Sequence, residues 1–130
     1  MKTIEVVAAI IRNQDQILCV QRPEHKYNYI SKKFEFPGGK VEPDESSEEA
    51  LRREIQEELS LDIEVNVRLL TVNHEYPDFS IKMHGYLCEC EDRELVLNEH
   101  IDHKWLDASK LSDLDWAAAD IPIVEKLIQE

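Results

Sequence analysis

Basic residues are scarce in this chain of 130 residues, which has 15 Lys and Arg against 28 Asp and Glu and a formal net charge of −13. Much of the acidic charge falls between positions 42 and 64, where only Arg52 and Arg53 are basic. Binding of nucleic-acid polymers depends on basic patches that neutralise phosphates. The sequence therefore argues against such a polymer as partner. A small phosphate ligand is still compatible with this charge if a metal ion brings positive charge.

Cysteines and long apolar runs are also rare. The three cysteines, Cys19, Cys88 and Cys90, are an odd number, and their spacing fits no zinc site. Cys88 and Cys90 would share one face of a strand, which is more typical of a core than of a metal site. No apolar stretch approaches the length of a membrane span, and residues 1–3 lead directly into a strand-like run instead of a signal peptide. We therefore expect no membrane partner and a reducing cytoplasm.

Residues 34–61, FEFPGGKVEPDESSEEALRREIQEELSL, are the most informative stretch. They predict a short strand, a break at residues 37–39, and then a helix that extends to Leu59. Ser46 or Ser47 is a suitable N-cap, and Ser46 with Glu49 forms a capping box. The four-residue spacing of the apolar positions predicts a buried stripe with Ala50 beside it; its members are Leu51, Ile55 and Leu59.

Three carboxylates on this helix suggest a metal site. Glu54, Glu57 and Glu58 are spaced i, i+3, i+4, so they cluster on one side and repel each other. Arg53 can pair with Glu57, and a hard divalent cation such as Mg²⁺ would offset the repulsion further. The alternative is a solvated acidic helix face. The Gly-Gly loop, Glu45 and Arg53, all in register with the carboxylates, favour the metal site.

The segments before and after this stretch predict a mixed fold. Residues 4–11 are continuously apolar and β-branched, which predicts a strand covered on both faces. Residues 13–15 form a turn, and residues 16–22 return as the second strand of a hairpin. Residues 23–33 are a polar loop that lies near the substrate entrance or is an ordinary surface loop; it carries His25, Tyr27 and Tyr29.

The C-terminal half predicts three strands and two helices. The strand at residues 63–73 would bury one face, and so would the strand at 79–90; these faces consist of Ile63, Val65, Val67 and Leu69, and of Ile81, Met83, Gly85 and Leu87. A short strand at 103–106 precedes a brief helix that Asp107 can cap. The last helix spans residues 118–129, with Pro122 in its first turn and four inward residues, Ile121, Val124, Leu127 and Ile128. The pattern fits α+β or a mixed-sheet α/β sandwich in one domain.

Residues 39–61 resemble the Nudix box, G-x5-E-x7-R-E-U-x-E-E-x-G-U, where U is a bulky apolar residue. Ser60 is the one departure, because the family has glycine there. Serine in a left-handed position costs about 1 kcal/mol relative to glycine, so we expect slightly lower stability and no loss of activity. Residues 35–40 and 119–122 also look like MutT-type nucleoside triphosphate diphosphatases. The resemblance implies one Nudix domain over residues 1–130 and the Nudix fold, a mixed β-sheet between helices.

The resemblance also implies a metal site and catalytic roles. Mg²⁺ or Mn²⁺ would be held by the Gly39 carbonyl and by four carboxylates, those of Glu54, Glu57, Glu58 and Glu99. Glu99 lies outside the box and is otherwise an ordinary exposed acid. The proton of the attacking water would pass to Glu54, Glu57 or Glu99. Arg53 would orient the glutamates by pairing, and Glu45 would support the loop.

Substrate binding is implied at two groups of positions. Arg22 and Lys40 match positions expected to touch phosphates, although either can be plain surface charge. Stacking on the base would come from aromatic residues, Phe36, Tyr76 or Phe79. Asp120 stands where MutT-like enzymes use Asn to bind oxidised guanine. An ionised carboxylate only accepts hydrogen bonds, which favours the amine of cytosine over guanine O6 unless burial keeps Asp120 protonated. Alternatively, Asp120 caps the final helix.

The implied reaction is hydrolysis of nucleoside triphosphates to monophosphate and pyrophosphate, which would sanitise the nucleotide pool. The substrates would be oxidised guanine nucleotides such as 8-oxo-dGTP, cytidine nucleotides, or both, and the enzyme would be a monomer or homodimer. One alternative is a Nudix hydrolase of ADP-ribose or a sugar nucleotide, whose members usually carry extra domains or signature residues. Another is a catalytically silent nucleotide-binding module, but such modules typically lose box glutamates that this chain retains.

Overall fold

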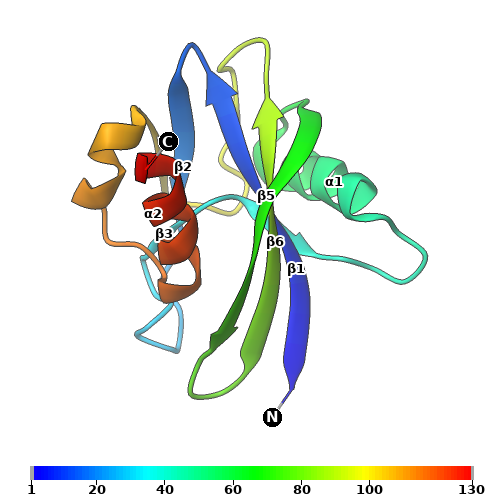
Figure 1. Ribbon diagram of the computed structural model, residues 1–130, viewed down its shortest axis with the longest axis vertical. Coiled ribbons are helices and arrows are strands. Elements are labelled where there is room, and N and C mark those ends of the chain that lie inside the picture. The colour runs from blue at the N-terminus through cyan, green and yellow to red at the C-terminus, as the bar shows by residue number, and fades with distance from the viewer. Residues whose placement is uncertain (1, 130) are drawn as a thin grey trace.

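A mixed β-sheet lies between helices in the computed structural model, which describes residues 2–129 (Figure 1). The strand order is β3-β2-β1-β6-β5, while β4 pairs with β1 and β7 pairs with β2. The strands are β1 (Thr3–Asn13), β2 (Gln16–Gln21), β3 (Phe34–Glu35), β4 (Gly38–Lys40), β5 (Glu64–Glu75), β6 (Ser80–Glu89) and β7 (Asp102–Leu106). The helices are α1 (Ser47–Leu59) and α2 (Ile121–Gln129), with 3-10 turns η1 (Ala108–Asp113) and η2 (Ala118–Asp120).

The predicted hairpin of β1 and β2 is confirmed, but the two strands pair only near their turn. Arg12 pairs with Ile17 and Asn13 with Gln16, and then the strands separate. Further along, β1 pairs with β4 and β2 pairs with β3. The Ala9 N–H also donates to the Pro37 carbonyl at 2.8 Å. The separation therefore admits residues 34–40 between the two strands and fixes their backbone at the centre of the sheet.

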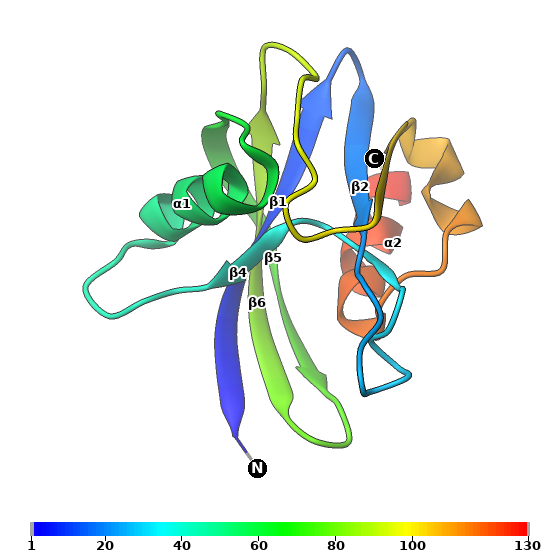
Figure 2. The same cartoon turned by 180° about the vertical axis from the view of Figure 1, so that it is seen from behind.

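Both faces of the sheet are covered, as the continuous apolar run of β1 predicted. Val7, Ala9 and Ile11 pack in the cluster that contains the buried side of α1, while Ala8 and Ile10 pack in the cluster that contains α2. Figure 2 shows the two helices on opposite sides of the sheet. The three cysteines are free; Cys19 and Cys88 are buried, and Cys90 packs beside the α1 cluster. None of the helices within residues 2–129 has the length and apolar character of a membrane span.

Helix α1 begins and ends as the sequence predicted. Ser46 is the N-cap, and both hydrogen bonds of its capping box with Glu49 are present. Ser60 is the C-cap in the left-handed region, with φ 52° and ψ 40°, and its N–H donates to the Gln56 carbonyl at 3.0 Å. The predicted stripe is fully buried, which turns the opposite, carboxylate-bearing side of the helix away from the core; its members are Ala50, Leu51, Ile55 and Leu59.

The predicted inner face of residues 63–73 is wrong beyond Val65. The pairing of β5 with β6 shifts register between Val65 and Arg68 and again between Arg68 and Leu70. A bulge inserts an extra residue and reverses which face the following side chains occupy. Val67 is therefore 59% exposed. The regular strand β6 keeps its predicted face, because Ile81, Met83 and Leu87 all pack toward α2.

The final helix starts later than predicted and has a different inner face. Residues 118–120 form η2, and α2 begins at Ile121 with Pro122 in its first turn. Ile121 is 42% exposed and Ile128 is 44% exposed, whereas Ile123 is fully buried with Val124 and Leu127. The preceding 3-10 turn sets the rotation of α2 so that Ile123 takes the inward position. Asp107 precedes η1 as predicted, but its side chain makes no capping bond.

Candidate active site

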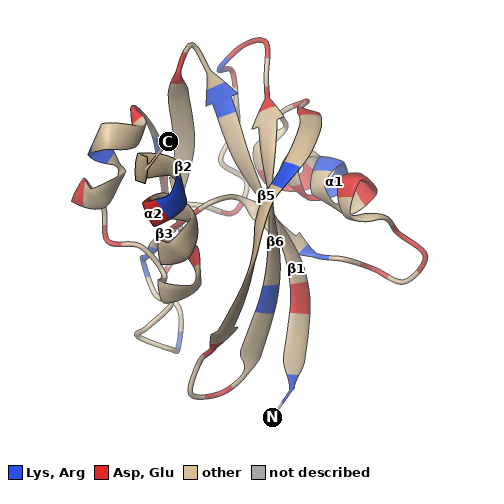
Figure 3. Ribbon diagram, viewed as in Figure 1, with Lys and Arg blue, Asp and Glu red and all other residues tan. Residues whose placement is uncertain are grey.

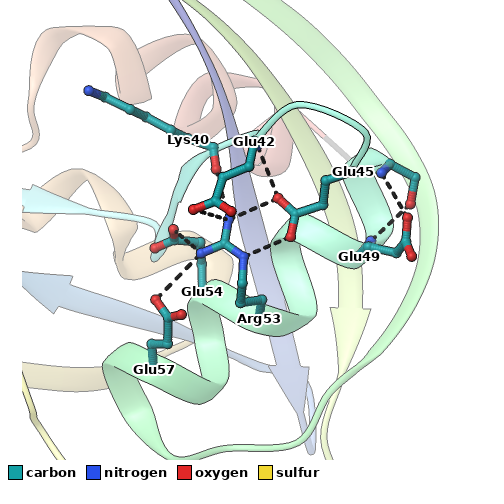
Figure 4. Close-up of polar contacts among 8 residues, drawn as sticks. Lys40, Glu42, Glu45, Glu49, Arg53, Glu54 and Glu57 are labelled. Atoms are coloured by element: carbon teal, nitrogen blue, oxygen red, sulfur yellow. Dashed lines mark hydrogen bonds and ion pairs between the residues drawn. The ribbon is translucent and has the colours of Figure 1, made fainter.

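Arg53 is hydrogen-bonded through its guanidinium to several residues of α1 and of the loop before it (Figure 4). Its guanidinium donates to both carboxylate oxygens of Glu45, with Nε–Oε2 at 2.7 Å and Nη2–Oε1 at 2.9 Å. Nη1 donates to Glu54 Oε1 at 2.8 Å, and Nη2 donates to the Lys40 carbonyl at 3.1 Å. The predicted pair with Glu57 is present but longer, at 3.4 Å. Arg53 therefore joins α1 to the loop before it, with Glu45 as its main partner.

Glu45 also bonds to the backbone of this loop. Its Oε1 accepts from the Glu42 N–H at 3.0 Å in addition to Arg53. The hydrogen bond from Arg53, followed by that from the Glu42 N–H, lowers the pKa of Glu45 to about 2. The same pairing raises the pKa of Arg53. Acidic residues are numerous along this loop and α1 (Figure 3), so the ion pair of Arg53 and Glu45 holds the loop against their mutual repulsion.

Gly39 and Glu54 are in direct contact. A Cβ added to Gly39 would collide with the Glu54 carboxylate, and one added to Gly38 would collide with the Val7 carbonyl. The two glycines are needed because the backbone passes close to a side chain and to a strand, not because of their φ angles. Burial raises the pKa of Glu54, against the opposing effect of Arg53. The carboxylate of Glu54 is thus held against the β4 backbone.

Glu58 is the most buried carboxylate of α1. Burial, followed by the negative charges of Glu35, Glu99 and Glu54, raises the pKa of Glu58 to about 9. Its Oε1 is buried without a hydrogen-bond partner among residues 2–129. A buried carboxylate oxygen without a partner is unfavourable unless a donor or cation satisfies it. A divalent metal with oxygen ligands would both satisfy this oxygen and neutralise the surrounding carboxylates.

The predicted metal ligands lie near one another, but their side chains do not converge. Within the described residues, no three acidic, histidine or cysteine side chains converge on a common metal position. The geometry explains this: Glu57 is 59% exposed and bonds to Arg53, which also bonds to Glu54, while Glu58 is partly buried and Glu99 is exposed. The contact at Gly39 and the unsatisfied Glu58 oxygen nevertheless fit a divalent cation at this position.

A cavity of about 390 Å³ opens beside this cluster. Eight of the predicted site residues line it, namely Arg22, Phe36, Gly39, Lys40, Glu58, Tyr76, Phe79 and Asp120. A larger hollow of about 640 Å³ lies past the end of α1, between residues 60–64 and 89–94. That hollow contains none of the box carboxylates from α1, so we assign the site to the smaller cavity, which adjoins them.

A model of the NUDIX domain matches residues 1–127. This chain belongs to the Nudix family. A CTP pyrophosphohydrolase of Escherichia coli K12 is 38% identical over 125 residues, which cover 96% of this chain and 91% of that protein. An 8-oxo-dGTP diphosphatase of the same strain is 30% identical over 127 residues and covers 98% of each chain. The crystal structure of a MutT protein from Methanosarcina mazei Go1 superimposes with a TM-score of 0.87 at 27% identity, over 98% of this chain and 94% of that one.

The protein is therefore a Nudix hydrolase, which hydrolyses phosphorus-containing anhydrides. Its mixed sheet between helices is the Nudix fold. Nudix hydrolases in general require a divalent metal, which agrees with the oxygen cluster on α1. Residues 39–61, the Nudix box, supply Arg53 and the carboxylates of that cluster. The cavity beside this cluster, in contrast, is lined mostly by residues outside the box.

The aromatic residues predicted to stack on a base are largely packed against protein. Phe36 is 3% exposed and stacks on Trp116 with a ring distance of 4.7 Å. Tyr76 is 5% exposed, stacks on Tyr29 at 5.2 Å, and accepts the Ala119 N–H on its hydroxyl at 3.0 Å. Phe79 is only half-buried. Of the three predicted rings, Phe79 is thus the most accessible, while Phe36 and Tyr76 shape the wall.

Asp120 is buried at the base of this cavity. Its Oδ1 accepts the Phe36 N–H at 3.0 Å, so the hydrogen bond comes from the residue after β3 and not from α2. The alternative prediction, that Asp120 acts as the side-chain cap of the final helix, is therefore not supported. Burial first, and then the charge of Glu35, raise the pKa of Asp120 well above its usual range.

Sequence analysis missed Glu35 and His100, whereas residues 25–27, in the loop expected near the substrate entrance or as ordinary surface, do line the cavity. Glu35 lines the cavity, pairs with Arg22 at 3.2 Å and accepts from His100 Nε2 at 2.9 Å. Its charge contributes to the raised pKa of both Glu58 and Asp120. The alternation of buried Phe34 and Phe36 around Glu35 was a signal that Glu35 faces elsewhere. Its partner His100 is 65 residues away, which no local pattern reveals.

Proposed function

We propose that this Nudix hydrolase converts nucleoside triphosphates to a nucleoside monophosphate and pyrophosphate, with Mg²⁺ or Mn²⁺ as cofactor. Cytidine nucleotides and oxidised guanine nucleotides such as 8-oxo-dGTP are the proposed substrates, which makes the enzyme a sanitiser of the nucleotide pool. One observation carries this proposal: a single cavity connects the box residues Gly39 and Glu58 with cationic side chains and with the buried Asp120. The activities for which the two E. coli relatives are named, CTP pyrophosphohydrolase and 8-oxo-dGTP diphosphatase, support it.

The metal end of the cavity is the Nudix box. We propose the Gly39 carbonyl and the carboxylates as ligands, which are Glu54, Glu57, Glu58 and Glu99. Bound there, the cation would lower the pKa of an attacking water and neutralise phosphate charge. Glu54, Glu57 or Glu99 would accept the proton of that water, and the exposed Glu57 and Glu99 are the two that solvent reaches readily. Arg53 keeps Glu54 in place throughout, because it is bonded to Glu45 at the same time.

Arg22 and Lys40 form the proposed phosphate-binding side. Both line the cavity; Arg22 directly follows β2, and Lys40 ends the segment 34–40 that separates β1 from β2. Lys40 is exposed, and Arg22 has a buried Nε that lacks a hydrogen-bond partner within residues 2–129. Two cations on an otherwise acidic surface favour an anionic group at this position. These two side chains therefore supply positive charge at the cavity, although the molecule as a whole has a net charge of −13.

Asp120 is the proposed base-reading residue. Burial raises the pKa of Asp120 and so favours the protonated carboxyl, in which one oxygen carries a hydrogen and can donate while Oδ1 accepts from Phe36. A protonated carboxyl does not repel a purine carbonyl as a carboxylate would. The burial of Asp120 therefore removes the main objection to oxidised guanine and leaves cytosine acceptable as well. Phe79 is the ring proposed to contact the base.

The test is a substrate panel assayed with Mg²⁺ and with Mn²⁺. It contains CTP, dCTP, 8-oxo-dGTP, dGTP, ADP-ribose and a sugar nucleotide, with separate detection of pyrophosphate and phosphate. We expect pyrophosphate release from the cytidine and oxidised guanine triphosphates. Glu58→Gln should abolish it, whereas Glu48→Gln on the same helix, where the side chain is 54% exposed, should not. Preferred cleavage of ADP-ribose, or no turnover of any triphosphate, would refute the proposal.

The cell compartment and assembly follow less directly from the structure. We propose a cytoplasmic location, because all three cysteines are free and a reducing compartment keeps thiols in that state. The enzyme is proposed to act as a monomer or homodimer without nucleic-acid or membrane partners. Light scattering of the purified protein measures the assembly directly.

A further inference from the structure

A chain of three side chains connects the protein interior with the cavity. Arg22 Nη1 donates to Glu35 Oε1 at 3.2 Å, and His100 Nε2 bonds to the other oxygen, Glu35 Oε2, at 2.9 Å. Exposure rises along the chain, because the side chains of His100, Glu35 and Arg22 are 3%, 18% and 36% exposed. Arg22 and Glu35 line the cavity, and His100 stands behind them. The arrangement presents Arg22 to the cavity and supports it from behind.

The backbone brings these residues together at strand β2. Arg22 follows β2, which pairs with β3 through Val20↔Glu35 and with β7 through Gln21↔Asp102. The Arg22 N–H donates to the Lys33 carbonyl at 2.9 Å, and the Ile101 N–H donates to the Gln21 carbonyl at 3.0 Å. Glu35 thus approaches Arg22 from β3 and His100 from the segment just before β7, on a backbone that is hydrogen-bonded on both sides. The alignment of the side chains is consequently fixed by the sheet.

The imidazole of His100 serves Glu35. Within residues 2–129 its Nδ1 is buried and has no hydrogen-bond partner, so the bond to Glu35 is what offsets the burial of this polar ring. Since Glu35 is a carboxylate acceptor on both oxygens, His100 Nε2 carries the hydrogen of this bond. With both oxygens engaged, Glu35 cannot rotate without breaking one bond. Its hold on Arg22 Nη1 therefore depends on His100.

We propose that His100 is a positioning residue that acts through Glu35 to hold the Arg22 guanidinium in the orientation that binds the phosphates of the substrate. This inference rests on the proposed function, in which Arg22 contacts phosphate. The buried and unpartnered Arg22 Nε is a second N–H whose direction the pair with Glu35 fixes. A guanidinium binds phosphate best when its N–H groups are fixed in advance, because less side-chain entropy is then lost on binding.

The test compares two substitutions of His100 with a matched control. His100→Phe keeps a planar ring but removes the donor, whereas His100→Gln places an amide donor the same number of bonds from Cβ as Nε2. His84→Phe is the control, since His84 is also a buried histidine that bonds to a glutamate, the exposed Glu5, at 2.7 Å, and neither residue lines the cavity. Steady-state kinetics with dCTP and 8-oxo-dGTP are measured for each variant with Mg²⁺.

In His100→Phe we expect KM to rise about five- to tenfold for both substrates, with kcat within about twofold, as loss of part of a charge-assisted hydrogen bond predicts. His100→Gln should restore KM, and His84→Phe should lower the melting temperature without changing KM. An unchanged KM in His100→Phe, the same KM rise in His84→Phe, or failure of His100→Gln to restore KM would overturn the proposal. A rise in KM for only one of the two substrates would assign His100, Glu35 and Arg22 to recognition of the base and would also overturn the proposal.

A second measurement does not depend on turnover. The NMR signal of the Arg22 Nε–H group, assigned by its loss in Arg22→Lys, should move toward the position of a free arginine in His100→Phe and stay in place in His100→Gln. If His100→Phe does not fold, Glu35→Gln replaces it and should move the same signal. An unmoved signal would refute the support by His100 even in a protein that hydrolyses no nucleotide. If the signal moves in His100→Phe and stays in place in His100→Gln, but no triphosphate is hydrolysed, the proposed function alone is refuted.

Discussion

Glu58→Gln should change how stability depends on pH in the protein without metal. The pKa of Glu58 rises from its ordinary value near 4.5 to about 9 in the folded state, because of burial and then the charges of Glu35, Glu99 and Glu54. Between these two pH values the folded protein binds a proton that the unfolded chain has lost. Stability is therefore complete below pH 4.5 and decreases as the pH rises toward 9.

The magnitude follows from the size of the shift. One pKa unit corresponds to about 1.4 kcal/mol, so the free energy of unfolding falls by about 3 kcal/mol between pH 4.5 and pH 7, and by about 6 kcal/mol by pH 9. Rotation of the side chain toward water reduces these values, which are upper limits. Glu45 and Glu49 act in the opposite direction, but their lowered pKa values place that effect below pH 4.5. Asp120 adds a further decrease of the same sign.

The assay is urea denaturation in EDTA at pH 5, 7 and 8.5. Glutamine is neutral and similar in shape, so Glu58→Gln should lose stability less steeply and exceed the wild type at pH 8.5. Glu57→Gln is the matched control, because its side chain is 59% exposed on the same helix, and it should follow the wild-type curve. If the free energy of unfolding depends on pH identically in the wild type and in Glu58→Gln, the pKa of Glu58 is not raised in the folded protein. Excess Mg²⁺ should stabilise the wild type more than Glu58→Gln.

Three further predictions concern the core, the chemistry and the base. Leu51→Ala should lower the free energy of unfolding by about 2–5 kcal/mol, since the side chain is fully buried. Val67→Ala, at a position 59% exposed, should change it by less than about 0.5 kcal/mol. Equal effects of the two substitutions in thermal melts would show that α1 or the β5 bulge is not arranged as described. Glu54→Gln should reduce kcat by about a hundredfold or more with an unchanged circular dichroism spectrum, and EDTA should abolish wild-type activity; full activity in either case would contradict the metal-site assignment. Asp120→Asn should change the ratio of kcat/KM between dCTP and 8-oxo-dGTP, and an equal loss for both would remove Asp120 from base recognition.

Local features of the fold were predictable because short-range physics determines them. The capping box at Ser46, the buried stripe through Leu51 and Ile55, and the left-handed Ser60 each depend on neighbours within a helical turn. The bulges in β5 were not predictable, because nothing in residues 64–70 resembles a turn and the extra residues are tolerated by pairing with β6. Likewise, the inner face of α2 depends on a 3-10 turn before it, whose few residues carry no periodicity of their own.

The candidate site divides along the same line. The box predicts Arg53 and the carboxylates together because they lie on one helix and the loop before it, so their spacing alone fixes their proximity. Glu35 and His100 meet only because β2 pairs with β3 on one side and β7 on the other. Asp120 shows the limit most clearly. Its residue type predicts a carboxylate acceptor unless burial keeps it protonated, and its burial against Phe36 in the folded chain shifts its pKa toward the protonated form. We therefore expect substrate preference to depend on a protonation equilibrium that the tertiary structure shifts, which Asp120→Asn tests.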